Sequence, residues 1–162
     1  MKKAVHYFIF VVGIVGLLLS SCRTLKFVAD ENYPSDQSTT ICFKGGSDVF
    51  GFLITKWNGI DIEDNLYGKL KVWTGNDQAV LIIPSGNSKI TFNAVFYANY
   101  FNYKIKNIEL EYNFESKKKY EIKRTKKTKG MLFNKSYEFF IGVYDITKGS
   151  ILLKEWKVGE SN

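Results

Sequence analysis

Histidine and cysteine, the side chains that most enzyme and transition-metal sites use, are scarce in this sequence. There is one histidine, His6, and there are two cysteines, Cys22 and Cys42. A histidine general base, a Ser-His-Asp triad and a zinc site all depend on residue types that the chain hardly has. No GxSxG, P-loop, HExxH or CxxC motif occurs either. We therefore expect no enzyme, no metal site and no cofactor.

Proline is also scarce, with two residues in a chain of 162, whereas 45% of the residues are apolar and 16% are aromatic. A disordered tail has too few apolar residues to form a core, and a collagen-like chain is rich in proline. The length suits one ordinary domain. The chain is therefore expected to fold as a single domain with an aromatic-rich core.

The first 22 residues have the features of a bacterial lipoprotein signal peptide. Lys2 and Lys3 give a positively charged start, and an uninterrupted apolar run follows from Phe8 to Leu19. That run is shorter than the about 20 residues that a membrane-spanning helix needs. It ends in Leu19-Ser20-Ser21-Cys22, which resembles the lipobox, whose cysteine is acylated and becomes the new N-terminus. The alternative is a short anchor helix that is never cleaved.

Cleavage at this motif would remove residues 1–21 and leave the lipidated Cys22 as the first residue. The mature chain would contain no histidine, and Cys42 would be its only free thiol, so that no intrachain disulfide could form. We interpret Cys42, within TTICF, as a small buried hydrophobic residue on a strand. Arg23, and not an aspartate, follows Cys22, which resembles lipoproteins that are exported to the outer membrane.

After the cysteine the sequence indicates a tether and then a β-sandwich. Residues 22–38 have no sustained periodicity, so we interpret them as the lipidated N-terminus and its tether, although three apolar residues there could dock on the domain. Residues 39–162 contain many short apolar or alternating runs, a pattern typical of a sandwich or barrel. The expected strands are 39–43, 50–57, 60–62, 69–73, 78–83, 88–97, 105–114, 119–125, 137–145 and 151–157.

Turns and alternation support an antiparallel arrangement. Asn58-Gly59 is typical of a type I′ hairpin turn, and Pro84-Ser85-Gly86-Asn87 is expected to reverse the chain. In IELEYNF, residues 108–114, apolar and polar side chains alternate, which predicts a strand with one wet face. The runs FGFLI and AVLII are apolar on both faces and predict central strands.

These elements, in this order, resemble a known type of module. Across residues 39–145, Asn58-Gly59, the stretch Pro84 to Ile90 and the stretch Glu115 to Ile122 are similar to the turns of the small sandwich modules of bacterial lipoproteins, of the PEGA type and the related DUF2846 type. The chain departs from that pattern in lacking a glycine near Lys118 and in an apparent insertion from Asn99 to Lys106. The resemblance implies an immunoglobulin-like or prealbumin-like fold without known catalytic residues.

The net charge of +7 is concentrated in one segment. Residues 117–129, KKKYEIKRTKKTK, contain eight basic residues against Glu121 alone. We interpret the segment as a strand to Thr125 that runs into a lysine-rich hairpin loop closed by Gly130. It is a candidate site for anionic lipid, polysaccharide or another acidic polymer, and the alternative is a solvated edge whose lysines prevent strand pairing. The candidate residues are Lys117, Lys118, Lys119, Lys123, Arg124, Lys126, Lys127 and Lys129.

Two other segments suggest weaker hypotheses. The stretch Phe96 to Tyr103 holds five aromatic residues, which would close the end of the core or, if exposed, contact sugars or a membrane interface. Asp61, Glu63 and Asp64 offer oxygen atoms of the kind that calcium binds, but they lack the regular spacing of a known calcium loop. Asp61 and Glu63 would fall on the same side of a strand simply by alternation.

The sequence as a whole predicts a lipid-anchored envelope protein whose all-β domain binds a partner without catalysis. The expected partners are the membrane, through the lipid, and an envelope protein, anionic lipid or polysaccharide. Nucleic acid is not expected for an exported lipoprotein. The alternative is a carrier of a small apolar ligand, with a barrel-like cavity lined by residues such as Phe92, Phe96 and Phe140.

Overall fold

The chain forms an all-β protein of two sheets packed face to face, as the sequence predicts. The computed structural model describes residues 24–29, 31–44, 51–64, 68–72, 77–130 and 135–161. Cys22 and the apolar run before it lie outside the described residues, so the lipoprotein motif stays a prediction. A short 3₁₀ turn, η1 (Ser35–Gln37), precedes the second strand.

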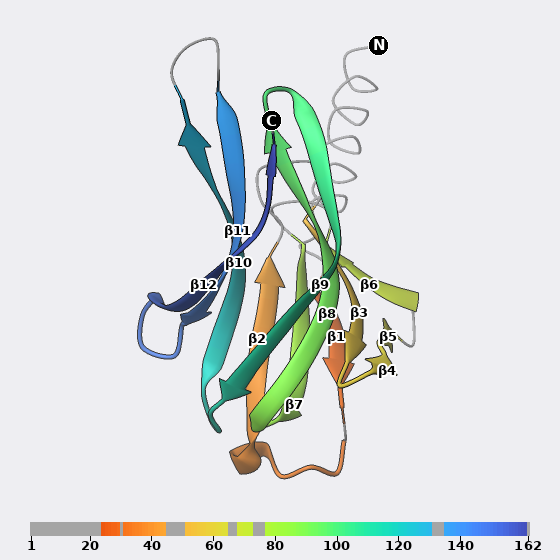
Figure 1. Ribbon diagram of the computed structural model, residues 1–162. Coiled ribbons are helices and arrows are strands. Elements are labelled where there is room, and N and C mark those ends of the chain that lie inside the picture. Colours follow the sequence, from red (N-terminus) through yellow and green to blue (C-terminus); the bar gives the residue numbers. More distant parts are fainter. Residues whose placement is uncertain are drawn as a thin grey trace, which may run out of the picture.

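Each sheet contains long strands that extend well beyond the shared core (Figure 1). The first sheet has the order β1 (Thr24–Val28), β7 (Gln78–Pro84), β2 (Ser38–Lys44), β10 (Lys119–Lys129), β11 (Ser136–Asp145), β12 (Ile151–Ser161). The second has the order β5 (Glu63–Asp64), β6 (Gly68–Val72), β3 (Phe52–Trp57), β8 (Gly86–Ala98), β9 (Phe101–Phe114), with β4 (Ile60–Asp61) paired to β3. Two neighbouring pairs, β1 with β7 and β2 with β10, are parallel.

The core follows from strand alternation. In β2, β7, β8 and β11 every second side chain is buried. Phe43 of the first sheet packs edge-on against Phe52 and Phe92 of the second, with ring centroids 5.2 and 5.4 Å apart. Residues 52–54 of FGFLI lie on β3 and the run AVLII lies on β7, each between two neighbours, which confirms central strands there.

Part of the predicted tether, residues 24–28, forms strand β1. Residues 24–28 pair in parallel with β7, and the Gln78 Nε2 donates a hydrogen bond of 3.0 Å to the Thr24 Oγ1. Leu25 is 2% exposed and belongs to the core. The short run TLKFV is apolar at alternate positions, so burial of Leu25 and the backbone pairing with β7 outweigh the lack of a longer periodicity. Residues 24–28, within the predicted tether, therefore belong to the first sheet.

The segment from Asn99 to Lys106 forms part of a hairpin between β8 and β9. Asn99 and Tyr100 have φ angles of 48° and 64°, which makes a tight turn between β8 and β9. A bulge follows, because Asn107, at φ 54°, places an extra residue in β9, and its backbone N–H donates to the Asn93 Oδ1 at 2.8 Å. The bulge shifts the inward-facing positions from Tyr103 and Ile105 to Ile108 and Leu110.

The strands also define two ends of the sandwich. The hairpin end contains the β8–β9 turn at Asn99-Tyr100 and the last residues of β10, which project together in Figure 1. The base end contains the β9–β10 turn at Ser116-Lys117 and the Pro84 to Gly86 turn. Strand β10 reaches Lys129, whereas the sequence predicted a loop after Thr125, because Lys126 to Lys129 pair with β11.

Strand β12 passes close to the edge strand β9 near the hairpin end. A Cβ atom at Gly159 would lie 2.6 Å from the Ile105 Cδ1. A larger residue at position 159 would have to displace the end of the Ile105 side chain, so the two edges approach each other closely here. Two register irregularities in β12, opposite Phe139/Phe140 and Val143/Tyr144, bend the strand along this path.

The role of β1 can be tested by unfolding. Leu25→Ala should cost about 2–5 kcal/mol of stability, because it removes a buried side chain from the core. Lys26→Ala, at an exposed position of the same strand, should change stability by less than about 0.5 kcal/mol. Urea denaturation of the mature chain with Cys22→Ser, which contains every described strand, measures both. Equal and negligible effects would mean that residues 24–28 are a tether after all.

Candidate functional site

The basic segment is divided between the two ends of the sandwich. Lys117 and Lys118 lie in the β9–β10 turn at the base end, and Lys119 begins β10. Lys129 ends the same strand at the hairpin end, about 33 Å away at 3.3 Å per residue. The eight basic residues therefore do not form one patch.

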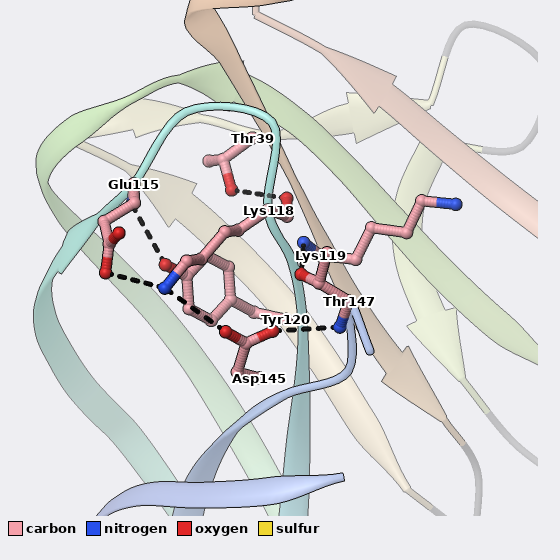
Figure 2. Close-up of polar contacts among 7 residues, drawn as sticks. All are labelled: Thr39, Glu115, Lys118, Lys119, Tyr120, Asp145 and Thr147. Carbon is pink, nitrogen blue, oxygen red and sulfur yellow. Dashed lines mark hydrogen bonds and ion pairs between the residues drawn. The ribbon is translucent and has the colours of Figure 1, made fainter. Parts of the chain in front are cut away.

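At the base end, Lys118 stabilises a turn (Figure 2). Its Nζ lies 2.9 Å from the Glu115 Oε1 and 3.3 Å from the Asp145 Oδ2, and its backbone carbonyl accepts a hydrogen bond from the Thr39 Oγ1. The hydrogen bond from Lys118 to Glu115 is the main cause of a raised pKa at Lys118. The pKa of Asp145 is lowered, mainly because its carboxylate accepts a hydrogen bond from the Thr147 backbone N–H. The ammonium of Lys118 is therefore already neutralised.

Tyr120 holds the same turn from the core side. Its hydroxyl oxygen accepts a 3.0 Å hydrogen bond from the Glu115 backbone N–H, and its ring is fully buried (Figure 2). Burial raises the pKa of the Tyr120 hydroxyl. This contact fixes the β9–β10 turn on the core. The charged residues of the base end therefore serve to stabilise the fold.

In the middle of β10 the charges pair across strands. Glu121 is 7% exposed and lies 3.3 Å from the Lys44 Nζ and 3.0 Å from the Lys123 Nζ. Lys123 also lies over the ring of Tyr144, 4.6 Å from its centroid. A buried carboxylate between two ammonium groups holds the outer face of the first sheet together.

The outward lysines near the hairpin end are paired as well. The Nζ of Lys127 lies 2.6 Å from the Glu155 Oε2, and the Nζ of Lys129 lies 2.7 Å from the Glu138 Oε1, which Lys157 also contacts. These hydrogen bonds lower the pKa of Glu138, through Lys129 and then Lys157, and that of Glu155, through Lys127. Lys127 and Lys129 therefore contribute little net charge to this surface.

Arg124 and Lys126 lie on the inner side of β10 and connect the two sheets. The Arg124 guanidinium donates to the Val95 carbonyl and lies over the Phe52 ring, 5.4 Å from its centroid. The Lys126 Nζ donates to the Tyr97 carbonyl at 2.6 Å. Both donors serve backbone carbonyls of β8, so they hold the end of the β8–β9 hairpin against β10.

Sequence reasoning missed two lysines of the second sheet. Lys104 and Lys106 lie on β9 beside the hairpin end and are exposed. Within the described residues Lys104, Lys106 and Lys126 form no ion pair with a carboxylate. The sequence pattern that indicates their exposure is the alternation YKIKN, in which the apolar Tyr103 and Ile105 are directed inward and the lysines outward. These three lysines, of which Lys126 belongs to the predicted cluster, are here called the unpaired lysines and are the candidate anion-binding residues at the hairpin end.

The aromatic segment is divided between core and surface. The rings of Phe96 and Tyr103 pack on Phe139, with centroids 4.7 and 5.2 Å away. Tyr100 and Phe101, by contrast, are 92% and 67% exposed at the turn. Phe96 and Tyr103 therefore belong to the core, whereas Tyr100 and Phe101 are exposed, and their contact with sugars or a membrane interface stays a prediction.

The three rings proposed to line a carrier cavity do not face a common space. Phe92 and Phe96 point into the packed core, where they are 0% and 4% exposed. Phe140 occupies an outward position of β11 under the Nζ of Lys127, 4.1 Å from its ring centroid. An open polar hollow of about 530 Å³ lies elsewhere, at the surface between Asn58 and Lys154.

Cys42 lies on the outer face of the first sheet and not in the core. It is half-buried on β2, and burial is the main cause of the raised pKa of its thiol. A raised pKa keeps the thiol protonated and unreactive near neutral pH. No group of three or more potential metal ligands occurs among the described side chains, and no described helix is long and apolar enough to cross a membrane.

Comparison with known proteins found no match. No family model, no curated protein and no solved structure matches this chain.

Acid should weaken the ion pairs near the hairpin end. The charged form of Glu138 is favoured in the folded state because its pKa is lowered from the ordinary value of 4.5. Its stabilisation is therefore complete above pH 4.5 and is lost as the pH falls through the lowered pKa. Melting curves below pH 4.5 should show a steeper fall in Tm for the natural protein than for Glu138→Gln. Parallel pH profiles of Tm would contradict the role of this carboxylate.

Proposed function

We propose that this protein is a lipid-anchored, non-catalytic binding domain of the bacterial envelope that contacts anionic lipid of its own membrane. The lipidated residue is Cys22, and the membrane is the outer membrane, as the Arg23 that follows it suggests. The contact is made by the hairpin end through the unpaired lysines.

One observation carries this proposal: strand β1 begins at Thr24, two residues after Cys22. Two extended residues span at most about 7 Å. A lipid on Cys22 therefore holds the sandwich itself at the head groups, without a spacer. A domain held so close to a bilayer presents its nearest charged surface to the lipid.

The charges that support the contact are those that no carboxylate neutralises. Each lysine near an anionic surface contributes about 1 kcal/mol. Lys104 and Lys106 are directed to solvent from β9, and Lys126 lies on β10 of the other sheet, tied to the β8 backbone. The paired lysines would first have to leave Glu138 or Glu155, so they add less.

For the finer fold we propose an immunoglobulin-like or prealbumin-like sandwich of the PEGA type. Asn58 and Gly59 have φ angles of 47° and 82°, the values of the type I′ turn expected in such modules. Lys117 has a φ of 61°, a conformation that glycine adopts easily. The glycine that the sequence lacks near Lys118 is thus replaced by a lysine in the conformation that the turn requires.

Replacing the anchor tests the first part of the proposal. Cys22→Ser removes the acylated thiol, so the protein should move from the membrane to the soluble fraction or remain unprocessed. Fractionation with metabolic fatty-acid labelling measures this, and Cys42→Ser is the matched control that should keep label and location. Label that persists in Cys22→Ser would refute lipidation at this residue.

Removing the unpaired lysines tests the contact with anionic lipid. In the mature chain with Cys22→Ser, changing Lys104, Lys106 and Lys126 to Gln should weaken binding to phosphatidylglycerol vesicles about 100-fold, since about 3 kcal/mol is lost. The control set, Lys117, Lys119 and Lys148 to Gln, removes the same charge from the base end. Vesicle sedimentation at two salt concentrations measures both, and equal effects of the two sets would overturn the assignment.

A further inference from the structure

The hairpin end carries two adjacent exposed aromatic side chains. Tyr100 is 92% exposed and Phe101 is 67% exposed, while Lys104 lies three residues further on β9. An exposed phenylalanine leaves apolar surface in water at a cost of about 25 cal/mol per Å². Tyrosine and lysine both combine an apolar body with a polar end, which suits the boundary between head groups and acyl chains. The combination is typical of a residue set that meets a membrane interface.

The aromatic pair is presented by a fixed turn. The Tyr137 hydroxyl donates a 2.6 Å hydrogen bond to the Asn99 Oδ1, which ties the turn to β11. Lys126 donates to the Tyr97 carbonyl just before the turn. Because both contacts come from the first sheet, the two sheets hold the hairpin end together. The exposed rings are therefore placed by the fold.

The hairpin end and the start of β1 point in the same direction. Thr24 pairs with Gln78, which pairs with Lys44 at the end of β2. Strand β10 runs parallel to β2, and its Ile122 pairs with Phe43, so the start of β1 lies level with about the middle of β10. From there β10 continues for six residues to Lys129, or about 20 Å. The hairpin end therefore projects beyond the point where the chain leaves for the anchor.

We propose that the hairpin end, with Tyr100, Phe101 and Lys104, is embedded in the head-group interface of the membrane that anchors Cys22. This rests on the proposed lipidation. The link from Thr24 to Cys22 spans at most about 7 Å, whereas the hairpin end projects about 20 Å in the same direction. The domain cannot hang clear of the bilayer at that distance, so its strands are inclined and its aromatic turn meets the lipid.

The bilayer dimensions fit this arrangement. The head-group layer on each side is about 5–7 Å deep, the depth of one or two side chains. Tyr100 and Phe101 at the turn fill that depth without placing backbone groups in the hydrocarbon. Lys104 then lies at the level of the lipid phosphates, as lysines near membrane surfaces do.

Fluorescence quenching in the lipidated full-length protein tests the proposal. Phe101→Trp places a reporter at the turn, and Ser116→Trp places one at the exposed turn of the base end. Both variants are reconstituted in phosphatidylcholine and phosphatidylglycerol vesicles, with and without lipids brominated near the head groups. Relative to the natural protein and its three tryptophans, the emission added at residue 101 should be strongly quenched and that at residue 116 unaffected. Equal quenching at the two positions, or none at residue 101, would overturn the proposal.

A second measurement needs no substitution at the turn. Hydrogen exchange at residues 97–103 should be slower in the reconstituted protein than in the soluble Cys22→Ser chain, while the base-end turn exchanges at one rate in both. Unchanged exchange at the hairpin end would also count against the proposal. If the protein carries no lipid and does not sediment with vesicles, the proposed anchoring fails. If it sediments but the turn is neither quenched nor protected, only the embedding fails.

Discussion

Strand β10 is the element on which the first sheet depends. It pairs in parallel with β2 and antiparallel with β11, and so joins the β1-β7-β2 half of the described sheet to the β11-β12 half. Its inner face contributes the buried Tyr120 and Ile122 to the core, while its outer face contributes Glu121 and Lys123 to the ion pairs. A single strand of mostly charged residues can occupy a central position because carboxylates of β10 itself, β11 and β12 pair with its lysines.

This pairing changes what the basic sequence can do. Eight basic residues in 13 positions suggest a strong anionic-ligand site, yet Lys118, Lys123, Lys127 and Lys129 each lie within 4.0 Å of a carboxylate. Alternation sends Arg124 and Lys126 to the other face, where they hold β8. Most of the positive charge therefore stabilises the sheet. The charge that remains for a partner is small, local and shared with β9.

The proposed lipid anchor would determine where the unpaired lysines lie relative to the bilayer. A long tether would let the domain rotate freely, and the position of any one lysine would then matter little. Because β1 starts two residues after Cys22, the proposed lipid and the fold would together select which end of the sandwich meets the bilayer. The edge strand β12 carries three exposed apolar residues, Ile151, Leu152 and Leu153.

Much of the fold was predictable because strand alternation and turn chemistry are local. The Asn58-Gly59 turn, the central positions of β3 and β7, and the one-sided β9 all follow from residues within a few positions of each other. Strand β1 was missed because five residues hold too little periodicity. Its partner β7 lies more than 50 residues away and is recognised only through pairing. The Asn99-Tyr100 turn was missed because two non-glycine residues there adopt positive φ.

For the candidate site, too, local features were predictable and contacts between distant strands were not. By itself, the sequence determined the class of fold, the scarcity of catalytic side chains, the candidate lipid-bearing cysteine and the presence of an aromatic and a basic segment, because these depend on composition and short spacing. Only the tertiary structure decided which lysines meet a carboxylate, which aromatic rings remain exposed, and toward which end of the sandwich the start of β1 points. Those outcomes depend on contacts between strands that are distant in the sequence. The residues of one strand do not determine which strand will lie beside it.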